Sequence, residues 1–226
     1  MTIFEKIFTL TNITYLLRCA EVSLILATSS IVLGTIIGTL TAAAKIGKNR
    51  VLKLIANAYI EFIRGTPMLL QLFIFFFGLP QLIPNYANLS FSTQVFVAGI
   101  VGMSINSGAY SAELIRSGIE SIDIGQWEAG KSLGMSYFKI MKLIILPQAF
   151  KRIIPPLVSE FIVLIKDSSL VSSIGATELL KGAQVIGSHY YNYMIPLFMA
   201  ALIYLAMTLT VSTLAKKIEK RMKIYD

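Results

Sequence analysis

The sequence predicts an all-α integral membrane protein with five transmembrane helices, formed as a single domain over residues 1–226. Three observations predict this class. Hydrophobic residues make up 55% of the chain, charged residues only 14%, and the mean hydropathy is +0.72; soluble domains are nearer a quarter charged. Several apolar stretches are long enough to cross a bilayer, which takes about 20 residues. Basic residues also cluster in segments that five spans would place on one side.

The predicted spans follow from the apolar stretches in chain order. Val22 to Ala44 carries no charge. Gly65 to Ala112 is also free of charge but too long for one helix, and Pro80 and Pro84 break its middle. We therefore expect two spans around an outer loop near 79–93. The predicted spans are about 20–44, 54–78, 94–118, 153–171 and 193–216.

Two further boundaries can be predicted. The first 20 residues lack the long apolar core and small-residue cleavage site of a signal peptide, so residues 12–20 are expected to form a lead-in helix at the membrane interface. Pro155 and Pro156 are expected to mark the start of the fourth span, because proline is tolerated at the beginning of a helix.

The distribution of basic residues predicts the orientation. Most of the 20 Lys and Arg residues lie in segments 45–53 and 120–152 and in the C-terminal tail. Positively charged loops stay in the cytoplasm, so we expect the N-terminus outside and the C-terminus in the cytoplasm. Nucleic-acid binding is the alternative interpretation of these charges. Because topology already accounts for them, no nucleic-acid partner is expected. In the tail the residues concerned are Lys216, Lys217, Lys220, Arg221 and Lys223.

Few residues are available for catalysis or metal binding. The chain has one cysteine, Cys19, and one histidine, His189, which argues against a disulfide framework, a metal site and a Ser-His-Asp hydrolase. The G-x-x-x-x-G-K-[ST] spacing of phosphate-binding loops occurs once, as GQWEAGKS at 125–132, but such a loop follows a β-strand, and this chain is predicted to be all-α. We therefore expect no cofactor in this chain and no enzymatic activity of its own, which also disfavours an intramembrane enzyme.

The inner segment at about 120–147 predicts a helix near 126–133, a turn at Gly134 and a second helix near 136–145. Both helices are too short to span a membrane. Ala129 and Gly130 are small, so that the surface of a partner could approach the backbone. The residues alone leave two interpretations open: a surface that binds a soluble partner, or an amphipathic helix on lipid.

This segment resembles the EAA signature of bacterial ABC importer permeases: Glu-Ala-Ala, three residues, Gly, nine residues, Ile, one residue, Leu-Pro. Glu128, Ala129, Gly134, Ile144 and Leu146-Pro147 stand at that spacing, with Gly130 in place of the second alanine. The flanking segments EFIRGTP (61–67), AYSAELIRSGIESI (109–122), GQWEAGKSLG (125–134) and KDSSLVSSIG (166–175) resemble the branch of that family that takes up polar amino acids.

The resemblance implies a type I-like importer fold in the bacterial inner membrane, working by alternating access. It implies an ATP-binding partner subunit that holds ATP and Mg²⁺, a second permease subunit forming a homodimer, and an extracytoplasmic solute-binding protein. Segment 120–147 would be the coupling-helix loop that binds to the ATPase subunit. The residues expected to make that contact are Glu128, Ala129, Gly130, Ser132, Leu133, Gly134 and Met135.

Polar residues at membrane depth are candidates for the substrate pathway, because charged groups there are costly. Glu61–Arg64 and Glu113–Arg116 are spaced to form ion pairs on one helix face. Glu160 has no basic residue three or four positions away, so it is either a substrate contact or part of an inter-helix ion pair. Gly65-Thr66-Pro67 is either a site with freed backbone groups or a simple kink. The pathway candidates are Glu61, Gly65, Thr66, Met103, Ser104, Asn106, Ser107, Tyr110, Glu113 and Glu160.

The acidic residues within the predicted spans exceed the basic residues by one, which favours a cationic substrate such as arginine, lysine or histidine. Glutamine, or another uncharged polar amino acid, is the first alternative. A channel or ion-driven carrier that acts without a partner ATPase is the second, and the EAA spacing argues against it.

Overall fold

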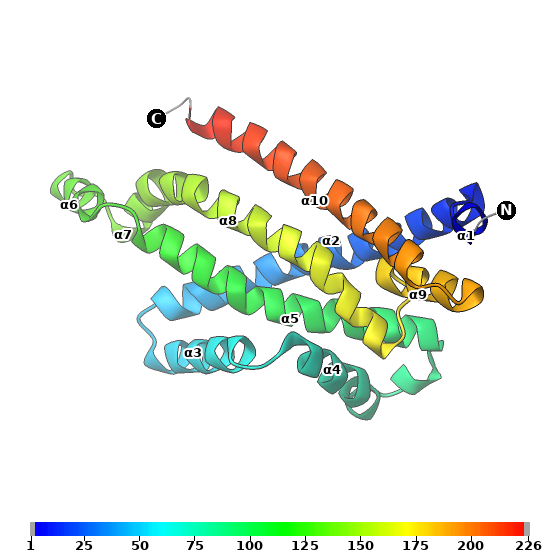
Figure 1. The fold of residues 1–226 in the computed structure, drawn as a ribbon. Coiled ribbons are helices and arrows are strands. Elements are labelled where there is room, and N and C mark those ends of the chain that lie inside the picture. Colours follow the sequence, from blue (N-terminus) through cyan, green and yellow to red (C-terminus); the bar gives the residue numbers. More distant parts are fainter. Residues whose placement is uncertain (1–2, 224–226) are drawn as a thin grey trace.

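The computed structural model describes residues 3–223, with side chains from residue 3 to 220. Arg221 and Lys223 of the basic tail lie outside the described side chains. The longer helices run along an elongated bundle (Figure 1). Their bounds are α1 Ile3–Ile7, α2 Leu10–Ile46, α3 Arg50–Arg64, α4 Met68–Leu82, α5 Phe91–Glu120, α6 Ile124–Ser132, α7 Tyr137–Ile140, α8 Leu146–Asp167, α9 Leu179–Tyr190 and α10 Met194–Lys223, with short turns η1 Tyr86–Asn88, η2 Met141–Ile145 (a π-helix) and η3 Ser168–Ile174.

The first span begins earlier than predicted. Thr9 caps α2, its hydroxyl accepting a hydrogen bond from the backbone N–H of Asn12, as N-cap residues do. The helix then continues without a break to Ile46. Residues 12–20 are therefore helical as predicted, but they are part of α2 and not a lead-in helix of their own, because the sequence from Leu10 to Leu33 contains neither glycine nor proline that would end the helix.

The second span is broken into two helices. α3 and α4 meet at an angle of 107° across Gly65-Thr66-Pro67. Proline has no backbone N–H to donate, and it disfavours helical geometry in the residue before it. The predicted interruption is confirmed, and its size rules out a gentle kink.

The fourth span starts differently from the prediction. α8 begins at Leu146 with Pro147 in its first turn, and Pro155 and Pro156 lie inside the helix. A proline in the first turn leaves no intrahelical bond unmade, whereas an interior proline removes one. The helix continues through both interior prolines, packed against α5 and α10. The expectation that Pro155 and Pro156 open the span is therefore wrong.

The helices that overlap the five predicted spans are α2, the α3–α4 pair, α5, α8 and α10. By length and composition, α2, α5 and α10 could each cross a membrane, and the bent α3–α4 pair could be a fourth span. α8 has 22 residues, about 33 Å of helix, which exceeds the roughly 30 Å hydrocarbon core. Its composition is less typical of a span, because it carries five charged residues: Lys151, Arg152, Glu160, Lys166 and Asp167.

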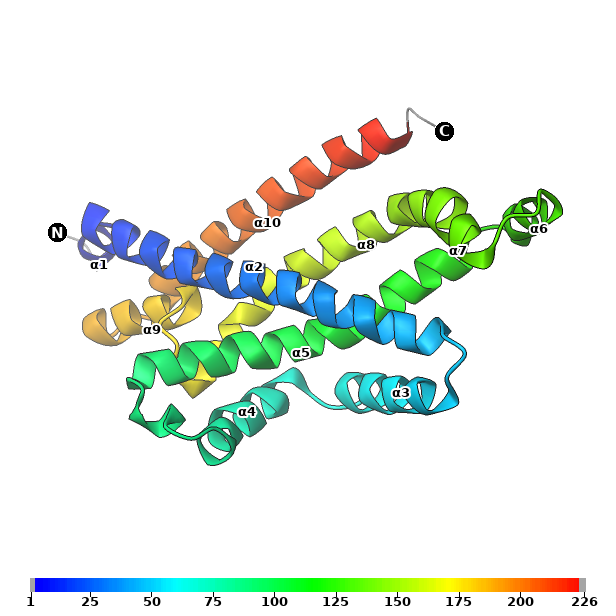
Figure 2. The ribbon, with the colours of Figure 1, turned by 180° about the vertical axis from the view of Figure 1, so that it is seen from behind.

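The central contact of the bundle joins α2 and α5, which cross in both ribbon views (Figures 1 and 2). A Cβ added to Gly34 would lie 2.8 Å from Cβ of Ser107, and one added to Gly38 would lie 2.6 Å from Cβ of Ser111. Small residues allow helix backbones to approach this closely in a membrane. This face of α5 is therefore fixed by packing against α2.

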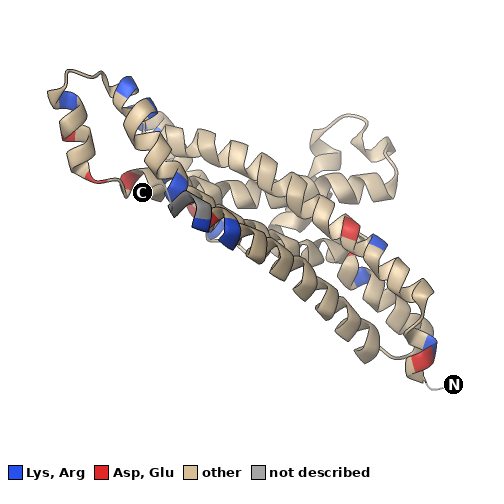
Figure 3. Ribbon diagram, turned by 90° about the horizontal axis from the view of Figure 1, so that it is seen from above, with Lys and Arg blue, Asp and Glu red and all other residues tan. Residues whose placement is uncertain are grey.

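The two ends of the bundle differ in charge. α6 and α7 form one end, while α9 and the N-terminus lie at the other (Figure 2). Basic residues gather at the α6 end and near the C-terminus, and the middle of the bundle is almost free of charge (Figure 3). We refer to the α6 end as the basic end.

Candidate functional site

The break between α3 and α4 is held by Gln71, whose side chain is only 2% exposed. Its amide nitrogen donates to the carbonyl oxygen of Ile63 at 2.8 Å, to the carbonyl oxygen of Thr66 at 3.1 Å and to the hydroxyl of Thr66 at 2.8 Å. Backbone groups freed by a break at membrane depth need such partners. Gln71 therefore stabilises the bend that Gly65 and Pro67 permit.

Gln71 also joins the break to α5. The amide nitrogen of Asn106, which is 7% exposed, donates to the Gln71 amide oxygen at 2.9 Å. One position earlier, the carbonyl oxygen of Ile105 accepts a hydrogen bond from the Tyr59 hydroxyl of α3 at 2.6 Å. Two predicted pathway residues, Thr66 and Asn106, are thus brought together by a residue that the sequence analysis did not select.

Arg64 at the end of α3 faces α5. Its guanidinium lies 5.3 Å from the centre of the Tyr110 ring, a cation–π contact. The described residues include no salt bridge between Arg64 and Glu61, so the predicted pair is wrong. Glu61 is exposed, and Tyr110 is 38% exposed. Two pathway candidates, Glu61 and Tyr110, thus lie with Arg64 on a surface that this single chain leaves open.

Glu113 belongs to an ion network at the basic end of α5. Lys45 of α2 contacts Glu113 at 2.5 Å, and Arg116 contacts it at 2.8 Å. Arg116 also pairs with Glu120. The predicted Glu113–Arg116 pair is therefore confirmed. Because its charge is balanced by two cations, Glu113 is less available to a substrate than the sequence implied.

Met103, Ser104 and Ser107 are buried in α5. Met103 is fully buried within the largest apolar cluster of the bundle. The hydroxyl of Ser104 makes no hydrogen bond to any described residue. Glu160 of α8 lies near Ser107 and is affected electrostatically by Asp167. It forms no salt bridge within the described part of the chain, so its half-buried carboxylate is unbalanced.

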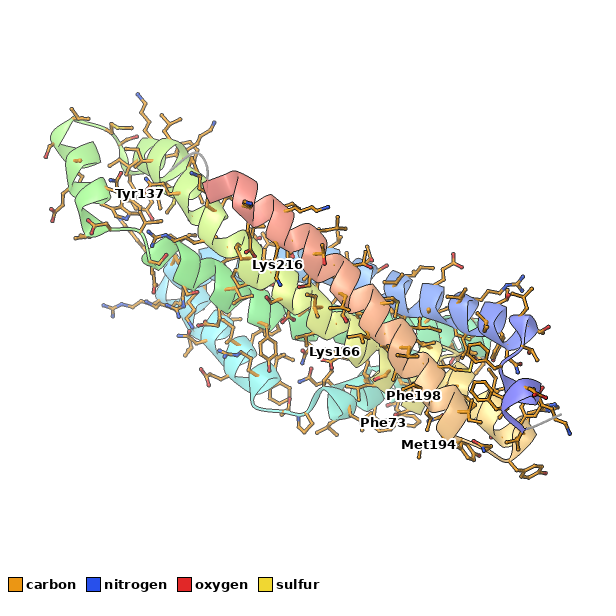
Figure 4. The ribbon with its side chains drawn as sticks, turned by 45° about the horizontal axis from the view of Figure 1, so that its top comes forward. Phe73, Tyr137, Lys166, Met194, Phe198 and Lys216 are labelled. Atoms are coloured by element: carbon orange, nitrogen blue, oxygen red, sulfur yellow. The ribbon has the colours of Figure 1, made fainter. Side chains whose placement is uncertain are left out.

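Lys166 and Asp167 end α8 partway along the bundle. Figure 4 shows Lys166 between the end marked by Tyr137 and the end marked by Met194 and Phe198. Lys166 is exposed and Asp167 half-buried. Neither forms a salt bridge among the described side chains. Together with Glu160, they place three ionisable groups in the second half of one helix.

Glu178 is a fully buried acid that the sequence analysis did not select. It caps α9, accepting hydrogen bonds from the backbone N–H groups of Leu180 at 2.9 Å and Lys181 at 2.8 Å. The Tyr204 hydroxyl of α10 donates to it at 2.7 Å, and Ser23 of α2 contacts it at 3.4 Å. Glu178 thus joins three helices at the end opposite α6. Its signal in the sequence was its place as the one acid in segment 172–192.

The predicted helix–turn–helix at the basic end is present. α6 ends at Ser132, and Gly134 has a φ of +71°, a left-handed conformation that favours glycine. The Trp127 ring of α6 stacks on Tyr137 of α7, with ring centres 5.2 Å apart. The second predicted helix consists of α7 and η2 and continues directly into α8.

Exposure divides the predicted coupling residues into two groups. Glu128, Ala129 and Ser132 are exposed, and Leu133 is 78% exposed. Met135 is half-buried in the apolar cluster beneath the loop. Gly130 is buried, and a Cβ there would lie 2.7 Å from Cγ1 of Ile140. Its small size is therefore required by packing of α7 onto α6, which corrects the expectation that it leaves room for a partner.

Residues 30–224 match the family described as binding-protein-dependent transport system inner membrane component. The chain is 43% identical over 211 residues to a putative glutamine transport system permease protein GlnP of Rickettsia typhi, covering 93% of this chain and 94% of that protein. It is 40% identical over 218 residues to the arginine transport system permease protein ArtQ of Bacillus subtilis, covering 96% and 97%.

Solved structures give the same result. A crystal structure of an amino acid ABC transporter with histidines is 40% identical, with a TM-score of 0.84 over 92% of this chain and 94% of that one. The MetNI methionine ABC transporter in an inward-facing conformation shares only the fold, at 17% identity and a TM-score of 0.75, covering 95% and 99%. The chain therefore belongs to the binding-protein-dependent transport system inner membrane components, as a permease subunit of a bacterial ABC importer for polar amino acids.

Proposed function

We propose that this permease imports a cationic amino acid, such as arginine, lysine or histidine, and that Glu160 contacts it. The observation that carries the proposal is the Glu160 carboxylate, which forms no salt bridge with a described residue and lies beside the buried Ser107 of α5. A buried acid without an ionic partner is costly, and a substrate ammonium or guanidinium would offset that cost. Glu113 offers no such opportunity because Lys45 and Arg116 already balance it.

Two relatives support a cationic substrate. ArtQ is named for arginine transport, and the similar solved structure holds histidines. Glutamine is the second candidate, because several putative Rickettsia relatives at 43–45% identity are named glutamine permeases. Gln71 and Asn106 supply amide groups that suit an uncharged side chain, but in this structure they bond to each other.

Uptake by the complete transporter distinguishes the two substrates. Glu160→Gln keeps the shape of the side chain and removes its charge. We expect arginine uptake to fall at least tenfold, corresponding to about 1.4 kcal/mol, and glutamine uptake to change little. Glu21→Gln, on an exposed acid of α2, is the matched control. Equal effects of Glu160→Gln on both substrates would remove the charge of Glu160 from substrate selection.

The proposal includes a homodimer. Glu61, Arg64 and Tyr110 lie on an open face together with apolar side chains such as Phe62, which is 60% exposed. Charged groups at membrane depth normally face a protein interior or a water-filled path. A second copy across this face would enclose them between the two subunits. Cysteine pairs placed at residue 61 of both subunits should then cross-link, whereas cysteines at residue 36 on α2 should not.

The proposal also includes an ATP-hydrolysing partner subunit that grips α6, fed by an extracytoplasmic solute-binding protein. The exposed Glu128, Ala129 and Leu133 form a compact surface beside the Gly134 turn. Packing of Gly130 on Ile140 makes this surface rigid, and only a rigid link couples two conformational equilibria efficiently. A stand-alone channel or carrier would instead transport without ATP in vesicles lacking the partner.

A further inference from the structure

A groove of about 630 Å³ opens at the basic end, between α2, α5 and α8. One wall is formed by α2 from Thr35 to its C-cap residue Gly47. Ile115 and Ile119 of α5 form a second wall. Phe150 and other apolar side chains of α8 complete the lining. Thr35 and Gly47 are about 18 Å apart along the helix axis. One leaflet of the hydrocarbon core is about 15 Å deep, so the groove matches the depth of an acyl chain.

Basic residues flank the end of this groove. Lys48 follows the lining residue Gly47, and Lys142 follows the lining residue Met141. Both lysines are exposed, and neither forms a salt bridge with a described residue. The acid nearest in sequence to the α5 lining, Glu120, pairs with Arg116, and Glu113 is balanced by Lys45 and Arg116. The two lysines therefore leave positive charge at the mouth of an apolar groove.

We propose that this groove binds an anionic phospholipid, with an acyl chain along α2 and the headgroup between Lys48 and Lys142. Basic pockets between transmembrane helices on the cytoplasmic side suit lipid headgroups of this charge. A second copy of the chain fits less well. The chain carries a net charge of +8, and its basic segments gather at this same end, so a second copy would bring like charge to the same mouth.

The groove also contacts the loop that carries α6. Tyr137 lines it while stacking on Trp127, and Met141 lines it from the π-helical turn η2. π-helical turns are frequent at functional sites. A bound lipid would thus contact Tyr137, on which Trp127 of α6 stacks.

The test measures lipid retention by native mass spectrometry on the full-length chain purified with its partner subunits. The probes are dioleoyl phosphatidylglycerol and dioleoyl phosphatidylcholine, which have the same acyl chains and differ in headgroup charge. Wild-type protein should retain the phosphatidylglycerol preferentially. Ala43→Trp, which fills the groove from an exposed lining position, should reduce retention of both lipids.

The paired variant Lys48→Gln/Lys142→Gln changes only exposed side chains, so it should fold normally. Each basic residue near the surface contributes about a fivefold preference for anionic lipid, so retention of phosphatidylglycerol should fall roughly 30-fold. Lys217→Gln on α10, which supplies no lining residue, is the matched control and should retain the lipid. Equal phosphatidylglycerol retention in all variants would overturn the proposal. So would dissociation of the permease dimer by Ala43→Trp with lipid retention unchanged, because a second copy would then occupy the groove.

Discussion

Gln71 and Asn106 form a buried amide pair in which Asn106 donates to Gln71 across a 2.9 Å hydrogen bond between α4 and α5. The same Gln71 side chain satisfies the backbone of the α3–α4 break. The bend of the second span and its position against α5 therefore depend on one side chain. This arrangement gives the first of four predictions about the fold.

Gln71→Leu should lower the free energy of unfolding by about 1–3 kcal/mol, because it leaves buried polar groups of Ile63, Thr66 and Asn106 without partners. The measurement is the thermal midpoint of the purified transporter in detergent. Gln81→Leu, on an exposed glutamine of the same helix that bonds only Phe77, is the control. Adding Asn106→Leu should recover part of the loss. Equal midpoints for the Gln71 and Gln81 variants would contradict the role of Gln71.

Gly38→Ala should separate α2 from α5. The new Cβ would lie 2.6 Å from Cβ of Ser111 and 2.9 Å from the backbone nitrogen of Ala112, and neither atom can rotate away. Overpacking of this kind costs about 1–3 kcal/mol. Gly78→Ala in α4 is the matched control, because nothing lies within 4 Å of its Cβ position; it should be neutral or stabilising by up to about 1 kcal/mol. A lower thermal midpoint for Gly38→Ala than for Gly78→Ala would support the contact, and the reverse order would refute it.

Gly130→Ala should loosen the packing of α7 on α6, because its Cβ would meet Ile140 at 2.7 Å. Trp127 is the single tryptophan of the chain and stacks on Tyr137, so its fluorescence reports on this loop. We expect a red-shifted emission from Gly130→Ala. Ile140→Ala should partly reverse the shift in the double variant, since residues in contact have non-additive effects. An unshifted spectrum for Gly130→Ala would show that Gly130 is not constrained by Ile140.

Replacement of Gly134 should follow the cost of a left-handed backbone. Its φ is +71° and no atom lies within 4 Å of the Cβ position, so conformation and not space determines the effect. Asparagine tolerates this region best, alanine less well and β-branched valine least. Copurification of the ATPase subunit should decline in the order Gly, Asn, Ala, Val. A variant series that ranks by side-chain size, with Asn below Ala, would contradict this explanation.

The sequence predicted the features that depend on residues close together in the chain. Pro67 breaks the second span where expected, and Gly134 adopts the turn between two short helices. The Glu113–Arg116 pair formed because three-residue spacing places both side chains on one helix face. The start of α8 was misplaced because Pro155 and Pro156 are tolerated inside a helix that packs on α5 and α10.

Tertiary contacts decided what the sequence analysis missed. Gln71 was a detectable signal, since it is a lone polar residue in an apolar run, but its partners Thr66 and Asn106 depend on the 107° bend. Arg64 turned to Tyr110 instead of Glu61 because α5 lies beside α3. Gly130 must be small because Ile140 packs against it, a contact that sequence spacing alone does not reveal.

The central claim is that the exposed surface of α6 faces the cytoplasm and is covered by an ATPase subunit. Leu133→Cys places a thiol on that surface, where Leu133 is 78% exposed, while the native Cys19 is buried at 3% exposure. The parent chain therefore provides the unlabelled control for a membrane-impermeant maleimide. We predict labelling of Leu133→Cys only in inside-out vesicles, with a clear loss of labelling when the ATPase subunit is present. Labelling from the outer side, or an equal rate with and without the ATPase, would contradict the account.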